Sequence, residues 1–448
     1  MTQPLPDILA VRPFERPVRG GVALPGSKSL TNRAMLLSAL CDGPVTLAGA
    51  LFSEDTRIMA EALRRLGFAV EEDEASRRIR VEGLGGRIPA SEADLFTGLA
   101  GTATRFLTAL CASSKGGLYR IDGVAQMRRR PMKGLIDALR AMGADIRCTG
   151  SEGFLPLEIR AAGLRGGPVA VNAAESSQIL SALLMVAPLA ERTVVATPAG
   201  GTRMPFVRMT TRQMAQFGVA GARADEGAGS MAVDPAAYRS PGSYAVEPDA
   251  TAASYFAALA LVAGGSLRLD GLVRAGASLQ GDVRFLDALA KCGAVVEVVE
   301  DGISVSFAPY GRRRGISYDF SEFSDTFLTL AAVAPLLEGP TRIQGIAHTR
   351  KQETDRVAGM AAELRRLGQE VVETEDSLEI HPRPLRKGVT VETHGDHRFA
   401  MSLAILGCRD VRGDGTPWLS IGDPACSAKT FPGFFELLDA IRAKSSEP

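Results

Sequence analysis

One pattern of hydrophobic and polar positions recurs along the chain. An amphipathic helix carries Leu or Met near its end, a glycine follows it, and then comes an alternating strand with acidic residues. The glycine occupies the position just after the helix, where the left-handed backbone conformation disfavours a side chain. Alternation such as that of residues 294–298 predicts a half-buried strand. The pattern therefore predicts helix–glycine–strand units.

These units repeat with a nearly constant period of about 75 residues, and they cover the whole chain of 448 residues. The five glycines are Gly67, Gly143, Gly218, Gly293 and Gly368. A sixth copy would begin its helix near Phe434 and the chain would end inside it. Each unit is too long for a solenoid repeat and too short for a typical domain. We therefore expect three units in each of two domains, with sheets and helices in both.

The composition is that of a globular protein, with 46% hydrophobic and 23% charged residues, which excludes disorder, collagen and coiled coil. Lys+Arg and Asp+Glu both number 51, so overall charge gives no reason to expect a nucleic-acid or anionic-membrane partner. Residues 250–267 are uncharged but contain glycines and serines, which favours a buried helix running into a turn over a membrane span.

Cysteine usage and the N-terminus both favour a reducing compartment. The six cysteines are scattered, and none forms a CxxC pair, so neither a zinc site nor a disulfide framework is expected. The first residues have neither the basic nor the apolar region of a signal peptide. We expect a cytoplasmic protein.

The first stretch with candidate chemistry is residues 24–33, which precede an apolar helix. The free N–H groups and the positive dipole end of such a helix suit an anion, and Lys28, Ser29 and Arg33 would add charges and a hydroxyl. An ordinary helix cap with a solvated lysine is the alternative. A P-loop is disfavoured, because Ser27 stands where the lysine should follow Gly26.

Three further stretches in the first half have the same character. Gly101 and Thr102 open an apolar helix, Arg130 precedes Pro131 and a helical stretch, and residues 176–178 (Ser-Ser-Gln) precede another apolar helix. Gly101 permits close approach of a ligand to the backbone, and we expect the Arg130 guanidinium at the start of the helix after Pro131. Plain helix starts and caps would explain each stretch taken alone.

The second half offers two carboxylates that could serve as acid or base. Asp325 precedes a strongly apolar helix and is either an N-cap or a base. Glu353 lies among cations in residues 350–356, which would keep it ionised, as suits a group that transfers protons. A solvated helix start is the alternative for this segment.

Residues 394–398 contain His394, Asp396 and His397, which invites a metal interpretation. Such a site needs a third or fourth ligand with suitable spacing, and neither His348 nor His381 has a companion motif, so this interpretation is disfavoured. Arg398 at the head of an apolar helix indicates an anion site instead.

Most of these stretches place cations or polar residues at a helix N-terminus in a repeated architecture. If the helices of each domain run parallel, their N-termini converge on one face, and two opposed faces would form a cleft rich in cations and amide donors. Such a cleft would bind small polyanions. With Asp325 and Glu353 as acid and base, metal-free group transfer is the expected chemistry.

The motifs resemble those of one family, the 5-enolpyruvylshikimate-3-phosphate synthases. The segments that carry the resemblance are LPGSKSLTNRA, LAGTATRF, SSQILSALLMVAPLA, KQETDR, GDHRFAM and DPACSAKTFPGFF, in this order, from about residue 25 to residue 435. The resemblance implies an α/β fold of two inside-out α/β domains, each of three βαβαββ units, with the active-site cleft between them. It implies residues 27–246 as one domain, and residues 1–26 with 247–448 as the other.

The resemblance also implies a reaction and its residues. The family transfers the enolpyruvyl group of phosphoenolpyruvate to the 5-hydroxyl of shikimate 3-phosphate, releases phosphate, and uses no metal or organic cofactor. Matching motifs imply Asp325, Glu353 and Lys28 as catalytic residues. The implied substrate-binding residues are Lys28, Ser29, Arg33, Gly101, Thr102, Arg130, Ser176, Ser177, Gln178, Asp325, His348, Arg356, Arg398 and Lys429.

Some positions depart from the commonest family pattern. Leu99 replaces an amide, His348 replaces an asparagine, and Gln352 replaces a lysine. The loss of a cation at Gln352 would lower the affinity for phosphoenolpyruvate or its analogue glyphosate. Gly101 leaves room for the phosphonate of glyphosate, so we expect inhibition by it. The alternatives are enolpyruvyl transfer to another alcohol and a binding paralogue without chemistry. We expect a monomer with small-molecule substrates and no nucleic-acid or membrane partner.

Overall fold

The computed structural model describes residues 5–199, 202–220, 222–225, 229–308 and 311–447, and it divides into two compact units. Unit 2 is residues Gly26–Glu247, and unit 1 is Met1–Pro25 together with Pro248–Pro448. The chain thus crosses between the units twice, and each crossing lies one residue from the boundary expected from the sequence. The ends of the second expected domain, residues 1–4 and 448, lie outside the described residues.

Unit 2 contains three four-stranded sheets, with strand orders β14-β3-β5-β4, β6-β7-β9-β8 and β10-β11-β13-β12. In each, the first two strands run parallel and the others pair antiparallel. The strands are β3 (Pro44–Ala48), β4 (Val70–Asp73), β5 (Arg78–Glu82), β6 (Glu92–Phe96), β7 (Leu118–Asp122), β8 (Asp145–Cys148), β9 (Leu157–Arg160), β10 (Gly167–Val171), β11 (Val194–Pro198), β12 (Arg223–Asp225), β13 (Ser230–Val233) and β14 (Ser243–Ala245).

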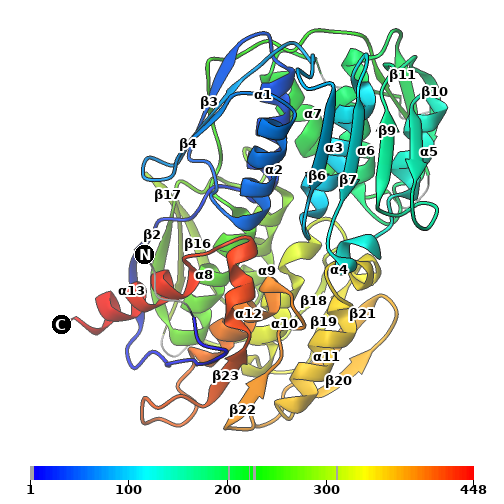
Figure 1. Ribbon diagram of the computed structural model, residues 1–448. Coiled ribbons are helices and arrows are strands. Elements are labelled where there is room, and N and C mark those ends of the chain that lie inside the picture. Colours follow the sequence, from blue (N-terminus) through cyan, green and yellow to red (C-terminus); the bar gives the residue numbers. More distant parts are fainter. Residues whose placement is uncertain (1–4, 200–201, 221, 226–228, 309–310, 448) are drawn as a thin grey trace. The chain divides into compact units, whose positions relative to one another are not determined.

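Helices fill the interior of unit 2 and also cover its sheets. They are α1 (Lys28–Leu40), α2 (Glu54–Arg65), α3 (Gly101–Ser113), α4 (Ala125–Arg128), α5 (Lys133–Ala141), α6 (Ser177–Val186) and α7 (Pro205–Gln216). Every residue of α3 is buried, whereas α2 and α5 bury only one face. Helices α3 and α6 lie side by side (Figure 1). The inside-out arrangement follows, because a helix that is apolar all round must be surrounded by other elements.

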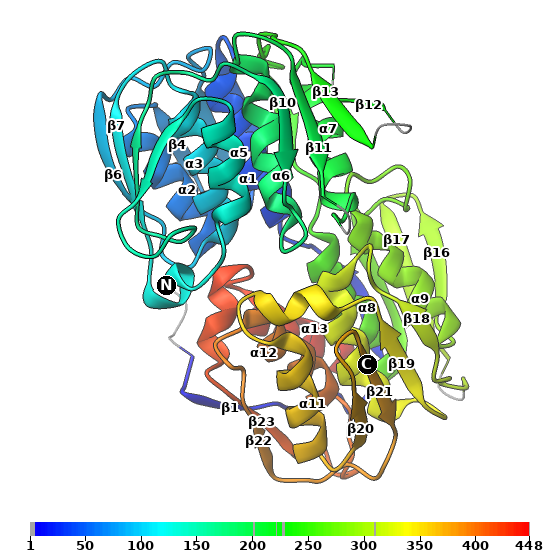
Figure 2. The same cartoon turned by 90° about the vertical axis from the view of Figure 1, so that its right-hand side faces the viewer.

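Unit 1 repeats this architecture with sheet orders β16-β17-β15-β2, β18-β19-β21-β20 and β1-β23-β22. Its strands are β1 (Ile8–Ala10), β2 (Val18–Val22), β15 (Gly265–Asp270), β16 (Val295–Val299), β17 (Gly302–Phe307), β18 (Ser317–Asp319), β19 (Thr341–Gln344), β20 (Glu370–Glu373), β21 (Ser377–His381), β22 (Val389–Val391) and β23 (Leu419–Gly422). The helices are α8 (Ala250–Ala263), α9 (Phe285–Lys291), α10 (Phe327–Val333), α11 (Arg356–Arg366), α12 (His397–Gly407) and α13 (Phe434–Ser446). The central helices α8, α10 and α12 pack against one another (Figures 1 and 2; α10 is labelled in Figure 1).

The predicted repeat is confirmed at its five glycines, which all adopt left-handed φ values between +84° and +110°. One residue of the third copy, residue 221, lies outside the described part. The helix expected to begin near Phe434 is present as α13, Phe434–Ser446. The N-terminal strand β1 pairs antiparallel with β23 and supplies the third strand of that sheet.

Two local predictions had different outcomes. Helix α8 ends at Gly264 and turns into β15, as expected of a buried helix, and no described helix is long and apolar enough to cross a membrane.

Strand β16 is more exposed than expected, with Val295 and Val298 exposed to 52% and 50%. The reason is its place at the edge of the sheet, where it pairs only with β17.

Candidate active site

In unit 2, the predicted residues gather at the starts of α1, α3 and α6. Ser27 and Ser176 cap α1 and α6, and each accepts a hydrogen bond from a backbone N–H of the first turn. The sequence folds this way because short hydroxyl residues precede apolar runs, which favours a helix start at that point. We call this group the unit 2 site: Lys28, Ser29, Arg33, Gly101, Thr102, Arg105, Arg130, Ser176, Ser177 and Gln178.

Gln178 connects α6 to α3 within the unit 2 site. Its Oε1 accepts a hydrogen bond from Arg105 Nη1 at 2.9 Å, and its Nε2 donates to Thr102 Oγ1 at 3.1 Å. Arg105 is 2% exposed and also donates to the backbone oxygens of Gly101 and Pro131. Arg105 and Gln178 therefore hold the two helix starts together.

The guanidinium of Arg130 lies over Gly101, at the start of α3. A methyl group added to Gly101 would lie 2.6 Å from Arg130 Nη1 and 2.9 Å from Cζ. The sequence predicted that this guanidinium lies at the start of the helix after Pro131. That helix, α5, begins at Lys133. The close approach that Gly101 permits is thus made by Arg130, which brings a cation to the positive end of α3.

Arg33 and Lys28 project from α1 in different settings. Arg33 is 1% exposed; its Nε donates to Thr210 Oγ1 at 2.7 Å and its Nη1 to the Ser29 oxygen at 3.0 Å. Burial lowers the pKa of Arg33 to about 9, which leaves it a cation at neutral pH. Lys28 Nζ pairs with the buried Asp55 carboxylate at 3.4 Å.

In unit 1, Arg356 is the centre of a second group of predicted residues. It is the first residue of α11 and is 2% exposed. It donates from Nε to Asp396 at 2.7 Å, from Nη2 to Glu353 at 2.8 Å and from Nη1 to Asp325 at 3.3 Å, and Gln352 Oε1 accepts as well. We call this group the unit 1 site: Asp325, His348, Gln352, Glu353, Arg356, Asp396, Arg398 and Lys429.

Both candidate acid–base carboxylates of the unit 1 site lie between two cations. Glu353 accepts from Arg356 and, at 2.9 Å, from Lys429 Nζ. Asp325 accepts from Arg356 and, at 2.7 Å, from Arg398 Nη2. Opposite charges at this distance stabilise the ionised form of a carboxyl group. Each carboxylate can therefore accept a proton and return quickly to the ionised state.

Asp396 orders the start of α12, where Arg398 lies. Its Oδ1 accepts from the Arg398 backbone N–H at 2.9 Å, and the side chain is fully buried. Burial lowers the pKa of Arg398, but nearby acidic groups, above all Asp325, outweigh burial and raise it. Arg398 therefore stays charged despite being 6% exposed.

Two of the histidines considered for a metal site contact other side chains. His348 Nε2 hydrogen-bonds Ser324 Oγ at 2.7 Å, and His394 Nε2 contacts Glu363 Oε1 at 3.1 Å. Within the described residues, no group of three or more His, Cys, Asp or Glu side chains could hold a metal ion. The histidine predicted to bind substrate, His348, does lie beside the segment that carries Asp325.

Sequence reasoning missed Arg105, Asp55 and Thr210, and it considered Asp396 only as a possible metal ligand. Arg105 and Asp396 stand inside motifs that were singled out, so their position before or within an apolar helix was an available signal. Asp55 lies in α2 and Thr210 in α7, far along the chain from their partners in α1. Nothing in the sequence pattern indicates those two pairings.

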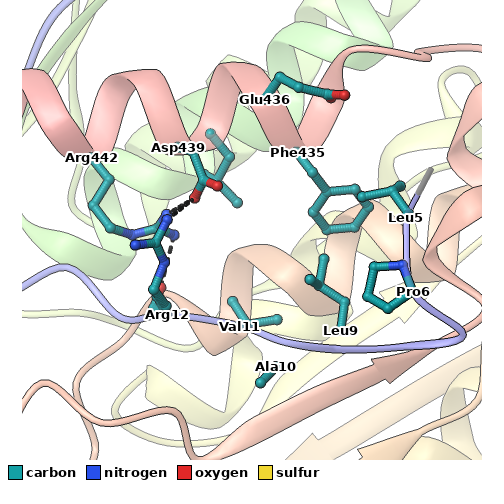
Figure 3. Close-up of a pocket in the computed structure, with 11 residues that line it drawn as sticks. Leu5, Pro6, Leu9, Ala10, Val11, Arg12, Phe435, Glu436, Asp439 and Arg442 are labelled. Carbon is teal, nitrogen blue, oxygen red and sulfur yellow. Dashed lines mark hydrogen bonds and ion pairs between the residues drawn. The ribbon is translucent and has the colours of Figure 1, made fainter. Parts of the chain in front are cut away.

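A separate hollow of about 350 Å³ lies between residues 5–12 and α13 in unit 1 (Figure 3). Its walls combine apolar side chains with four charged ones, and on one side Arg12 pairs with Asp439 at 3.0 Å. None of the predicted site residues lines it. It therefore plays no part in either site.

Comparisons with known proteins agree on one family. Residues 14–438 match the model of EPSP synthase (3-phosphoshikimate 1-carboxyvinyltransferase). The chain is 62% identical over 447 residues to the 3-phosphoshikimate 1-carboxyvinyltransferase of Opitutus terrae, covering 99% of each, and 41% identical to that of Trichormus variabilis, covering 96% of this chain and 98% of the relative.

A solved EPSP synthase structure from Acinetobacter baumannii superimposes with a TM-score of 0.79 at 26% identity, covering 97% of this chain and 98% of that one. The match confirms the predicted two-domain α/β fold class. Fold, family model and full-length relatives all agree, and the chain belongs to the EPSP synthase family.

Proposed function

We propose that this chain transfers the enolpyruvyl group of phosphoenolpyruvate to the 5-hydroxyl of shikimate 3-phosphate and releases phosphate. This is the activity of the family to which the chain belongs, and the chain is an enzyme of that family. The observation that carries the proposal is the unit 1 site, where Asp325 and Glu353 each lie between two cations and are poised for proton transfer.

The reaction adds the 5-hydroxyl oxygen to C2 of the enolpyruvyl group and a proton to C3. The tetrahedral intermediate then loses phosphate from C2 and a proton from C3. We assign Asp325 as the base that accepts the hydroxyl proton, and Glu353, with Lys28, to the proton transfers at C3. A carboxylate between two cations suits both roles, because it recovers its charge after each transfer.

Substrate binding is assigned to the cations and helix starts of both sites. We assign the shikimate phosphate to residues of α1 and α6: Lys28, Ser29, Arg33, Ser176, Ser177 and Gln178. Phosphoenolpyruvate would contact Lys28, Gly101, Thr102, Arg130, Gln178, Arg356, Arg398 and Lys429. Helix N-termini and arginines both favour phosphate and carboxylate groups, and they stabilise charge that develops on the intermediate. His348 would help to bind substrate beside Asp325.

The first experiment measures phosphate release from phosphoenolpyruvate in EDTA, with and without shikimate 3-phosphate. The proposal predicts release that requires shikimate 3-phosphate and is insensitive to the chelator. Release with another alcohol only would favour an enolpyruvyl transferase of different specificity. Binding of either substrate without release would favour a non-catalytic paralogue.

We also propose that the enzyme is a cytoplasmic monomer. Support comes from its six free cysteines, four of them buried, since structural disulfides mark oxidising compartments. Light scattering should give a mass near 47.2 kDa, and a mass of twice that value would contradict the monomer.

A further inference from the structure

Asp282 is a buried carboxyl group of unit 1 that takes no direct part in the proposed reaction. It lies in a short 3₁₀ turn, Gly281–Arg284, and is 5% exposed. Its Oδ2 accepts a hydrogen bond from Thr251 Oγ1 at 2.8 Å, while its buried Oδ1 has no partner among the described residues. A buried carboxyl group with one oxygen unsatisfied is costly and calls for an explanation.

The turn that holds Asp282 is fixed to the start of α8. Gln280 accepts a hydrogen bond from the Ala250 backbone N–H at 3.0 Å and donates to the Pro248 oxygen at 2.7 Å. The turn also packs against α8 and against residues 324–326, the segment that carries Asp325. Asp282 is therefore held in a defined place rather than on a mobile loop.

The charged and titratable groups around Asp282 come from three elements. Asp249 caps α8, Asp325 precedes α10, and Arg398 lies at the start of α12. Tyr255 of α8 and Asp396, which caps α12, act in turn on Arg398. Burial is the main cause that raises the pKa of Asp282 to about 7; Asp325 and Asp249 raise it further, and Arg398 lowers it. Asp282 and Asp325 thus both act on Arg398.

We propose that Asp282 is a positioning residue that sets the proton affinity of Asp325 through their mutual repulsion and their shared attraction to Arg398. When Asp282 is neutral, it no longer competes with Asp325 for the charge of Arg398, and Arg398 stabilises the ionised form of Asp325 more strongly. When Asp282 is ionised, its negative charge makes Asp325 a stronger base. Asp282 itself exchanges no proton with substrate. The inference rests on the proposed function, in which Asp325 accepts the hydroxyl proton.

The sign of the pH dependence follows from this arrangement. As pH rises through neutrality, Asp282 loses its proton, Asp325 becomes more basic, and turnover rises. A shift of about one pKa unit in a general base changes its rate about three- to tenfold, since catalytic efficiency follows basicity. The proposal therefore predicts a step of that size in the pH profile of kcat.

The test compares Asp282→Asn with Asp287→Asn, an exposed control five residues away. Asp282→Asn should abolish the step near pH 7, leave kcat at its low-pH level, and change both KM values less than about twofold, because no substrate contact is removed. The unfolding temperature at pH 8 should be equal or higher, because a buried charge is gone. Asp287→Asn should behave as wild type.

Thr251→Val gives a second, independent readout. The variant loses the hydroxyl that stabilises ionised Asp282, so the step should move to higher pH. Infrared difference spectra should show the band of a protonated carboxyl group that disappears near pH 7 in the wild type and is absent in Asp282→Asn.

Three results would overturn the proposal. They are a step that survives in Asp282→Asn, a loss of kcat by the same factor at every pH, and a wild type without the titrating infrared band. A wild-type chain that releases no phosphate would contradict the proposed function instead, and the infrared titration would still report whether Asp282 titrates.

Discussion

The two sites use cations in different ways. In the unit 2 site, Lys28 pairs with the Asp55 carboxylate, but Arg33 donates to a hydroxyl and a backbone oxygen, both of them neutral. In the unit 1 site, Arg356 and Arg398 donate to carboxylates. An arginine held by neutral groups keeps its full charge for a bound anion, whereas one paired with carboxylates also sets their protonation.

The unit 1 site is close to charge balance. Its three cations, Arg356, Arg398 and Lys429, face the three carboxylates of Asp325, Glu353 and Asp396. We therefore expect unit 2 to supply most of the attraction for phosphate groups and unit 1 to manage protons. Variants in the unit 2 site should therefore mainly raise KM, and variants in the unit 1 site should mainly lower kcat.

The largest effect is expected for Glu353→Gln in the unit 1 site. The amide keeps the shape but cannot accept a proton, so kcat should fall about 10²- to 10⁴-fold. The KM of both substrates should change much less. Steady-state kinetics measure this, with Glu375→Gln as a control, since Glu375 is 85% exposed. A rise in KM at constant kcat would contradict the division between the units.

An intermediate effect is expected for Gly101→Ala in the unit 2 site. The new methyl group would collide with Arg130 Nη1 and displace its guanidinium. Loss of one charge-assisted contact should raise the KM of phosphoenolpyruvate about tenfold, with kcat reduced less. Gly116→Ala is the control, because a methyl group there meets no atom within 4 Å. An unchanged KM would show that Arg130 does not hold the substrate.

Gly101→Ala also tests the expected inhibition by glyphosate. The wild type should bind glyphosate with an inhibition constant comparable to the KM of phosphoenolpyruvate, and Gly101→Ala should weaken both. An inhibition constant far above that KM in the wild type would contradict the expected sensitivity.

The smallest effect is expected for Gln352→Lys. Gln352 now gives Arg356 a neutral acceptor, and a lysine would add one positive charge to a balanced site. The KM of phosphoenolpyruvate and the inhibition constant of glyphosate should both fall about two- to fivefold, as a partly screened charge allows. Lys351→Gln, which removes an exposed neighbouring charge, should change either constant less. A rise in both constants would show that the acceptor for Arg356 matters more than charge.

The repeat and the helix starts could be predicted from the sequence because both depend on local patterns. Gly67 and its equivalents mark helix ends, and Ser27 or Ser176 before an apolar run marks a helix start. The sequence also places Glu353 among cations, and Arg356 and Lys429 do surround it.

Contacts between distant segments could not be predicted in this way. Thr210 with Arg33 joins different repeats, and Asp55 with Lys28 joins two helices of the first repeat; the pattern within a single segment carries no signal for either contact. The place of Arg130 over Gly101 depends on how two helices pack. The exposure of β16 depends on strand order, and alternation along one strand does not reveal whether that strand lies at a sheet edge.

The most direct test of the division between the units is deuterium exchange into C3 of phosphoenolpyruvate during turnover in D₂O. Proton addition and removal at C3 should label the wild-type product and the recovered substrate. The account predicts that Gly101→Ala retains this exchange at saturating substrate, while Glu353→Gln binds both substrates and loses it. Exchange at the wild-type rate in Glu353→Gln, or its loss in Gly101→Ala at saturation, would contradict the account.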